Sequence, residues 1–255
     1  MKVLIIGAGR MGLWFYRRLE SLGHTAELSE RRRERAEELR AQGYRLYGGE
    51  GLRGYDMIIS ATNIGSLQEV IEGVEREGFS GPFVEIGGIK SPYFRLLSGL
   101  SYPVSVHPLF GPGASTLIGK KVILVPVKDA EREMSMARKI FEEATIVAMS
   151  PEEHDRLVLR TIQLMQLLSI IFNRIAPEED WSVSQSLMKY VESVSLSGSE
   201  ELVREMFRMN PYVEELRKEV ERAVSEVFDG SFRIRERGYF ERLYRKAYRM
   251  IESDG

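Results

Sequence analysis

The amino-acid sequence predicts an α/β protein in which a doubly wound parallel sheet is followed by an all-α helical domain. Three observations point to this fold class. Short β-branched runs alternate with longer amphipathic stretches in the first part of the chain, as in a parallel sheet covered by helices. A glycine-rich turn directly follows the first apolar run. From Pro151 onward the strand-like runs stop, and the sequence is almost wholly helical.

The first part of the chain is expected to alternate strand and helix. Its apolar runs predict strands over residues 2–6, 25–28, 57–61, 83–86, 104–106, 122–125 and 145–147. Between them, apolar residues at helical spacing predict helices over residues 11–22, 31–42, 67–76 and 130–143. This order is that of a sheet built from β-α-β units.

The boundary between the two domains is expected near Ser150. The residues at 150–153, Ser-Pro-Glu-Glu, read as a helix N-cap with proline at the first helical position. The sequence therefore predicts a first domain over residues 1–150 and a helical domain over residues 151–255. The helical domain begins with a long, strongly apolar helix over residues 152–175, and further helices are expected after Asp180, Ser199 and Asn210.

The apolar stretch of the long helix, from Leu164 to Phe172, is wider than one buried face requires. A second copy of the chain would cover it, because this half of the chain is short for building a core around so apolar a helix. The sequence thus favours a homodimer. Cover by the chain's own C-terminal helices is the alternative.

Composition excludes several classes of protein. The chain has 255 residues, a formal net charge of −2 and a pI near 6.1, so no overall positive field is available for a nucleic acid. It has no cysteine, which excludes disulfides, thiolate nucleophiles and cysteine-bound metals. Met1 to Ile6 run straight into a strand without a basic leader or a long apolar stretch, so we expect a cytoplasmic protein that neither is secreted nor spans a membrane.

The glycine-rich turn has the pattern of a Rossmann-type dinucleotide site. Gly7, Gly9 and Gly12 follow a strand and open a helix: the first permits a tight turn, the second a close approach to the pyrophosphate, and the third close packing of helix on strand. The helix N-terminus then faces the anion. We expect the cofactor to contact these glycines together with Arg10 and Met11.

Glu30 follows the second predicted strand, 18 positions after Gly12. A carboxylate at this place binds the adenosine ribose hydroxyls and selects NAD. Three arginines follow it. Arg31, Arg32 and Arg33 are placed to hold a 2′-phosphate instead, or to form the exposed first turn of a helix. Because Glu30 would repel a 2′-phosphate, the sequence favours NAD, with NADP as the alternative.

Of the three histidines, His107 is the candidate base. It follows the strand predicted at 104–106, and ligands bind at the C-terminal edge of parallel strands. Prolines and glycines fix its loop, and a histidine accepts protons near neutral pH. His24 lies in a turn and is expected to face solvent. His154 opens the long helix, where capping or domain contacts are expected rather than chemistry.

Three segments resemble those of prephenate and arogenate dehydrogenases. They are residues 85–90 (Glu-Ile-Gly-Gly-Ile-Lys), residues 107–112 (His-Pro-Leu-Phe-Gly-Pro) and residues 151–155 (Pro-Glu-Glu-His-Asp). The resemblance runs from Met1 to about Pro211, and the histidine segment is its most specific part. It implies a nucleotide-binding domain joined to a helical domain that dimerises, a small-molecule substrate held between them, and His107 as the catalytic base.

The reaction that this resemblance implies is an oxidative decarboxylation. The 4-hydroxyl of the substrate loses its proton while C4 gives a hydride to the nicotinamide, and loss of the ring carboxylate restores aromaticity. No metal is needed. The protein supplies orientation, a base and cationic groups for two carboxylates.

The sequence departs from the family at three places. Gly88 stands where the family has a serine near the histidine and the nicotinamide, and Gln166 replaces a substrate-contacting histidine twelve residues after the His-Asp pair. Ungapped counting places Glu205 where the family has its substrate arginine, with Arg204 beside it and Arg208 one turn away. Either arginine is expected to hold a substrate carboxylate, the alternative being that both are surface residues.

Two other functions stay open. One is another small-molecule dehydrogenase of the same fold, which the first domain alone would suit but which would not explain the histidine loop. The other is a non-catalytic protein that binds a dinucleotide and uses its helical half for regulation or assembly.

Overall fold

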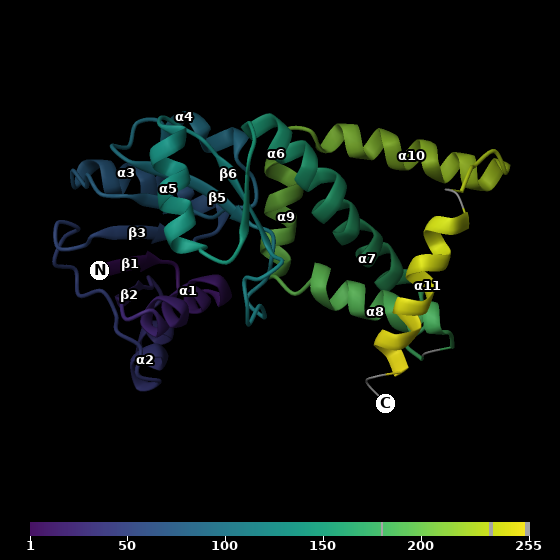
Figure 1. Ribbon diagram of the computed structural model, residues 1–255, viewed down its shortest axis with the longest axis horizontal. Helices are drawn as coiled ribbons and strands as arrows, with labels where there is room; N and C mark the ends of the chain where they lie inside the picture. The colour runs from purple at the N-terminus through teal and green to yellow at the C-terminus, as the bar shows by residue number, and fades with distance from the viewer. Residues whose placement is uncertain (180, 235–236, 253–255) are drawn as a thin grey trace. The chain divides into compact units, whose positions relative to one another are not determined.

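The computed structural model describes residues 1–179, 181–234 and 237–252 (Figure 1). It divides the chain into two compact units, Met1–Asp155 and Arg156–Gly255. The division falls inside helix α6 (Pro151–Val158), whereas the sequence predicted a boundary in front of this helix. His154 and Asp155 therefore belong to the first unit. Asp180, after which a helix was predicted, lies outside the described residues.

A seven-stranded sheet with the order β2-β1-β3-β4-β5-β6-β7 forms the first unit. All neighbouring strands pair in parallel except β5 and β6, which are antiparallel. The strands are β1 (Lys2–Ile6), β2 (Thr25–Ser29), β3 (Met57–Ser60), β4 (Phe83–Glu85), β5 (Pro103–Pro108), β6 (Lys121–Val125) and β7 (Thr145–Ala148).

Each strand corresponds to a predicted one, and the predicted parallel sheet is confirmed except for the antiparallel pairing of β5 with β6. The connection from β5 to β6, residues 109–120, contains no helix. Parallel neighbours need a long crossover, so a chain that returns without one pairs in the antiparallel direction. As a result β6 and β7 run opposite to the other five strands.

Helices cover the sheet. The four predicted helices correspond to α1 (Arg10–Ser21), α2 (Arg33–Ala41), α3 (Leu67–Arg76) and α5 (Ala130–Ile140). A short helix, α4 (Phe94–Leu97), was not predicted. The first unit therefore has the Rossmann-type α/β architecture that the sequence predicted, with a mostly parallel sheet.

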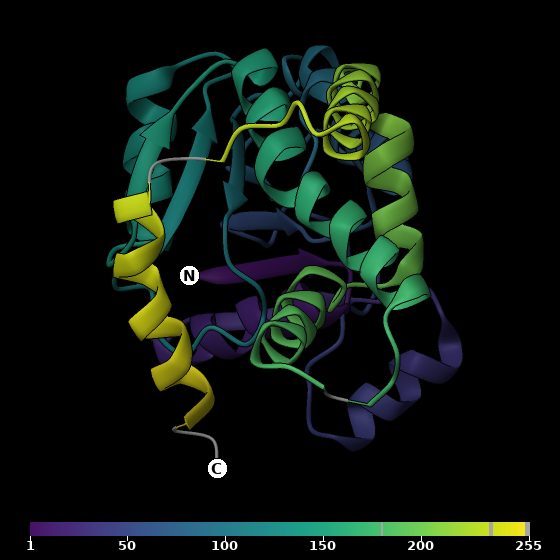
Figure 2. The ribbon, with the colours of Figure 1, turned by 90° about the vertical axis from the view of Figure 1, so that its right-hand side faces the viewer.

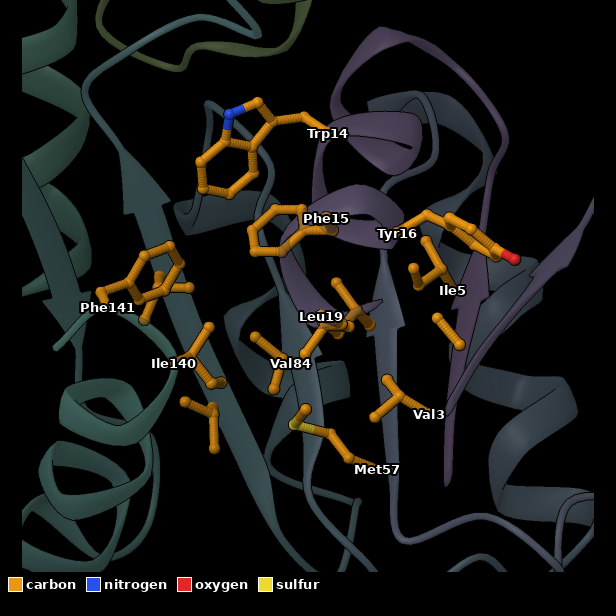
Figure 3. Close-up of a cluster of buried hydrophobic side chains, with 14 of the residues drawn as sticks. Val3, Ile5, Trp14, Phe15, Tyr16, Leu19, Met57, Val84, Ile140 and Phe141 are labelled. Carbon is orange, nitrogen blue, oxygen red and sulfur yellow. The ribbon is translucent and has the colours of Figure 1, made fainter. Parts of the chain in front are cut away.

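Aromatic residues fix α1 to the sheet (Figure 3). Phe15 on α1 is buried and packs edge-on against Phe141, with ring centroids 5.9 Å apart. Leu19, one turn further along α1, lies in the same cluster as Val3 and Val84 of the strands. Full burial of one such side chain contributes about 1.5–3 kcal/mol to folding. This packing holds the N-terminus of α1 at the end of β1.

The second unit is built from helices, and no strand occurs within its described residues (Figure 2). Helix α6 continues through a π-helical turn at Leu159–Gln163 into α7 (Leu164–Ile175). The remaining helices are α8 (Val183–Ser195), α9 (Glu200–Met209), α10 (Val213–Asp229) and α11 (Arg237–Glu252). The predicted all-α second half is confirmed. None of the helices, over their described residues, is long and apolar enough to cross a membrane.

Candidate active site

The glycine turn after β1 requires its first and third glycines. Gly7 has a φ of +104°, and a Cβ atom there would lie 2.5 Å from the carbonyl oxygen of Ala61. A Cβ on Gly12 would lie 1.9 Å from the carbonyl oxygen of Gly7. Any side chain at either position would collide with backbone, so the turn keeps its shape only with glycine at both.

The middle glycine and the helix start leave room for an anion. No atom lies within 4 Å of a Cβ built on Gly9, which is the N-cap of α1 and gives the helix no side-chain cap. Uncapped N–H groups at a helix N-terminus attract negative groups. Arg10 and Met11 form the first turn of α1, Arg10 exposed and Met11 partly buried. The turn thus fits the phosphates of a dinucleotide.

Glu30 lies directly after β2, the parallel neighbour of β1. Burial opposes ionisation of this carboxyl, but hydrogen bonds from the backbone N–H and the guanidinium of Arg32 outweigh it and lower the pKa of Glu30. Arg31 points to another group, since it donates to Glu69 at 2.7 Å and to Ser66 at 3.2 Å. A negative charge therefore lies beside the glycine turn at the end of β2.

His107 lies near the C-terminal end of β5. The strand was predicted to end at Val106 but continues to Pro108, so His107 is a strand residue paired with Ile123 of β6. Because β5 runs parallel to β4, the end of β5 and the glycines that follow β4, Gly87 and Gly88, lie at the same edge of the sheet. The histidine is thus at the edge where ligands of such sheets bind.

A hydrogen-bonded chain starts at His107 and ends at a carboxylate. The Nδ1 atom of His107 lies 2.9 Å from Nε2 of His154, and Nδ1 of His154 lies 2.7 Å from Oδ1 of Asp155. The backbone N–H groups of Lys90 and Ser91 each donate to this carboxylate at 2.9 Å. His154 and Asp155 are both completely buried.

Burial and hydrogen bonds set the charge states of His107, His154 and Asp155. Desolvation lowers the pKa of His107 well below its ordinary value, and the charges of His154 and Lys90 lower it further. Desolvation also lowers the pKa of His154, more than the bond to Asp155 raises it. Burial raises the pKa of Asp155, but the hydrogen bonds from His154 and Ser91 outweigh burial, so the pKa is lowered from its ordinary value. At neutral pH both imidazoles are neutral and the carboxylate is ionised.

Lys90 and Glu85 form a buried ion pair that contacts β5 next to His107. The Nζ atom of Lys90 donates to Oε2 of Glu85 at 2.6 Å and to the carbonyl oxygen of Val106 at 2.7 Å. Glu85 also accepts from the hydroxyl of Ser105 at 2.9 Å and from the backbone N–H of Gly87. Lys90 thereby ties the segment after β4 to the residue that precedes His107.

The contact between His154 and His107 was not predicted from the sequence. Capping or domain contacts were expected of it, and its ring lies between His107 and Asp155, so it contacts a residue of the predicted first domain. Forty-seven positions separate the two histidines, so no spacing in the sequence connects them. The adjacent aspartate was the only available signal, because a buried imidazole beside a carboxylate is a common pair at catalytic sites.

Gln166 lies on the buried side of α7, in the second unit. Its side-chain nitrogen is 3.8 Å from the sulfur of Met206, and its side-chain oxygen has no hydrogen-bond partner among the residues that the structure describes. Ser169, one turn on, has a buried hydroxyl in the same condition. Gln163, one turn before, accepts from Asn210 at 2.6 Å. A row of polar groups therefore follows one side of this helix.

The two candidate arginines lie on the exposed side of α9. Arg204 forms an ion pair with Glu200, one turn earlier, and Arg208 is also exposed. The buried side of the helix carries Glu205 with Val203 and Met206. The structure thus places a carboxyl, not a guanidinium, on the buried side.

No family model matches the sequence. A probable arogenate/prephenate dehydrogenase of Methanocaldococcus jannaschii is 27% identical over 170 residues, which cover 61% of this chain. The matched part is 37% of that relative, so the chain spans little more than a third of its length.

Three solved structures are similar. A putative prephenate dehydrogenase of Corynebacterium glutamicum has a TM-score of 0.74 and 17% identity, over 96% of this chain and 89% of that one. Prephenate dehydrogenase of Aquifex aeolicus, in complex with hydroxyphenyl propionate and NAD+, has a TM-score of 0.72 and is 19% identical. The match covers 99% of this chain and 98% of that one. Synechocystis arogenate dehydrogenase has a TM-score of 0.63 and is 18% identical, and the match covers the whole of both chains. The chain thus has the fold of these dehydrogenases, and the resemblance found in the sequence is confirmed.

Proposed function

We propose that this chain is a nicotinamide-dependent dehydrogenase that oxidises and decarboxylates prephenate or arogenate, giving 4-hydroxyphenylpyruvate or tyrosine. The observation that carries the proposal is the state of His107. It is neutral, lies at the C-terminal end of β5, and uses Nδ1 to bond His154, which leaves Nε2 for a substrate hydroxyl. The shared fold and the name of the M. jannaschii relative support the same reaction.

The residues would act as follows. Nε2 of His107 takes the proton of the 4-hydroxyl as C4 loses a hydride, so that the C–O bond becomes a ketone. The bound nicotinamide supplies the hydride acceptor. Breaking the bond to the ring carboxylate releases carbon dioxide, and its electron pair completes the aromatic ring while the ketone oxygen regains a proton. The glycine turn and Glu30 would hold the cofactor, and Gly88 would lie beside its nicotinamide.

For the substrate, we retain Gln166 as a contact and Arg204 or Arg208 as the cationic group. The unpartnered oxygen of Gln166 supports the first assignment, because a buried acceptor without a donor costs about 1–3 kcal/mol that a substrate donor would recover. The exposed position of both arginines leaves either of them accessible to a carboxylate.

A turnover assay tests the function. The purified chain is mixed with prephenate or arogenate and NAD or NADP, and reduced nicotinamide and carbon dioxide are measured. Release of both in equal amounts is expected with at least one substrate. Nucleotide binding without turnover of either substrate would favour the non-catalytic alternative, and reduction without carbon dioxide release would favour another dehydrogenase.

We predict that NAD binds more tightly than NADP. A 2′-phosphate beside the Glu30 carboxylate would meet a like charge, and such contacts cost several kcal/mol. Glu30→Ala should therefore strengthen NADP binding by on the order of tenfold or more, measured by titration calorimetry. Glu34→Ala, an exposed glutamate in the first turn of α2, is the matched control. NADP binding to the unaltered chain as tightly as NAD would overturn the assignment and favour Arg31.

We also propose that the second unit forms a homodimer through α7. Leu168, Ile171 and Ile175 repeat at helical spacing on this helix and are 41%, 40% and 77% exposed. Solvent-exposed apolar side chains that line up on one face of a helix are typical of a surface covered by another chain.

Sedimentation at micromolar concentration should show a dimer. Ile171→Glu should shift the equilibrium toward the monomer, because it would place a charge in the buried contact. Lys139→Glu introduces the same residue on the exposed side of α5 and should leave the dimer intact. A chain that sediments as a monomer at every concentration would point to cover by its own helices.

A further inference from the structure

We propose that His154 and Asp155 act as a positioning pair, which holds His107 in the tautomer with a bare Nε2 atom and shares the proton that His107 takes up. The proposal rests on the proposed function in one respect only, namely that His107 is the base. The placement of protons in the chain follows from the contacts themselves.

The direction of each hydrogen bond is determined by the carboxylate at the end of the chain. Asp155 is ionised and can only accept, and two backbone N–H groups hold it in place. Its neighbour, Nδ1 of His154, must therefore carry the proton. A neutral imidazole has one N–H, so Nε2 of His154 is an acceptor.

The same reasoning extends to the base. Since Nε2 of His154 accepts, Nδ1 of His107 must donate, and Nε2 of His107 has no proton. In the opposite tautomer of His154, a lone pair of Nδ1 would face the ionised carboxylate of Asp155 at 2.7 Å, while the N–H group on Nε2 would donate to His107. That arrangement would lose the bond to Asp155 within a buried site, where an unmade bond is costly.

The hydrogen bonds between His107, His154 and Asp155 also distribute the positive charge that the base acquires. When a proton binds to Nε2 of His107, the Nδ1–H bond can break as an N–H bond forms on Nε2 of His154. The positive charge then lies on the ring in contact with Asp155, and one proton in total has been gained. The other charged groups near the pair are Lys90, which disfavours the charge, and Glu85, which favours it. Asp155 is the carboxylate in direct contact with the His154 ring.

Nuclear magnetic resonance of the imidazole nitrogens tests the tautomers without any substrate. The chain has three histidines, so a His24→Asn variant assigns the spectrum. At neutral pH His107 and His154 should each carry the proton on Nδ1. His154→Leu removes the acceptor and should release His107 to a mixture of tautomers, whereas His154→Gln keeps an oxygen near the position of Nε2 and should retain the native one.

Kinetics provide the second measurement. His154→Leu and Asp155→Asn should each lower kcat on the order of ten- to a hundredfold, with the KM for the cofactor unchanged. Asp155→Asn should also move the acidic limb of kcat/KM to lower pH, because the protonated histidines lose the carboxylate that favours their charge. His154→Gln should recover most of kcat. A merely structural pair would lower thermal stability without moving the pH profile of the folded protein.

The outcomes separate the two proposals. A proton on Nε2 of His107 in the unaltered chain, or an unchanged His107 tautomer in His154→Leu, overturns the positioning pair. If His154→Leu does not fold, the unaltered chain and His154→Gln still decide the tautomer. The expected tautomers in a chain that turns over neither substrate would leave the pair established and contradict the proposed function instead.

Discussion

Replacing His107 with asparagine should lower turnover on the order of a hundredfold or more, the usual contribution of a general base. Asparagine can still donate to Nε2 of His154 through its amide nitrogen but has no basic atom for the substrate proton. The fold and the affinity for NAD should therefore be preserved. Steady-state kinetics and NAD titration on this variant, with His24→Asn as the matched control, check both expectations.

The pH profile checks the same base. A base must be neutral, so kcat/KM rises as pH increases through the pKa of His107. Burial, and then the charges of His154 and Lys90, lower this pKa below its ordinary value near 6.5. The rise should therefore lie below pH 6.5, with no further effect of this group above it. Near-normal turnover of His107→Asn, or a rise centred above pH 6.5, would rule out the assigned base.

Replacing Lys90 with methionine should destabilise the first unit by about 3–5 kcal/mol, because it leaves the Glu85 carboxylate buried without its partner. Both side chains are nearly inaccessible to solvent, so water cannot compensate. Denaturant unfolding followed by the fluorescence of Trp14 measures the loss. The chain has two tryptophans, so the measurement uses a Trp181→Phe background, in which the signal reports the first unit.

Two further variants isolate the buried pair. Adding Glu85→Gln to Lys90→Met should recover much of the stability, since the uncompensated charge is removed while the acceptor for Ser105 is kept. Lys121→Met changes an exposed lysine of β6 in the same way and should alter stability by no more than about 1 kcal/mol. A loss from Lys90→Met no larger than that of Lys121→Met would show that the pair contributes little.

The strands and helices could be predicted because each has a local signal. Residues 3–6 form a continuous apolar run before a glycine turn, and α1 carries Phe15 and Leu19 at helical spacing. The reversal between β5 and β6 was not predicted, although the sequence analysis places no helix between the strands at 104–106 and 122–125. It depends on the absence of a crossover helix in residues 109–120.

The site was predictable only in part, for a related reason. His107 could be found because it follows a strand and precedes a rigid loop. The partnership with His154 could not, since it arises when the start of α6 packs against the segment after β4 and Asp155 accepts from Lys90. The side of α9 that carries Arg204 was also unpredictable, because Glu205 occupies its buried side.

The place where the chain divides has a consequence for His107. The first unit ends at Asp155, and α6 continues into the second unit from Arg156. His154 and Asp155 are anchored to the first unit by hydrogen bonds to His107, Lys90 and Ser91. The hydrogen bonds that orient His107 therefore lie within one unit of the chain, and the placement of its protons needs no contact with the second unit.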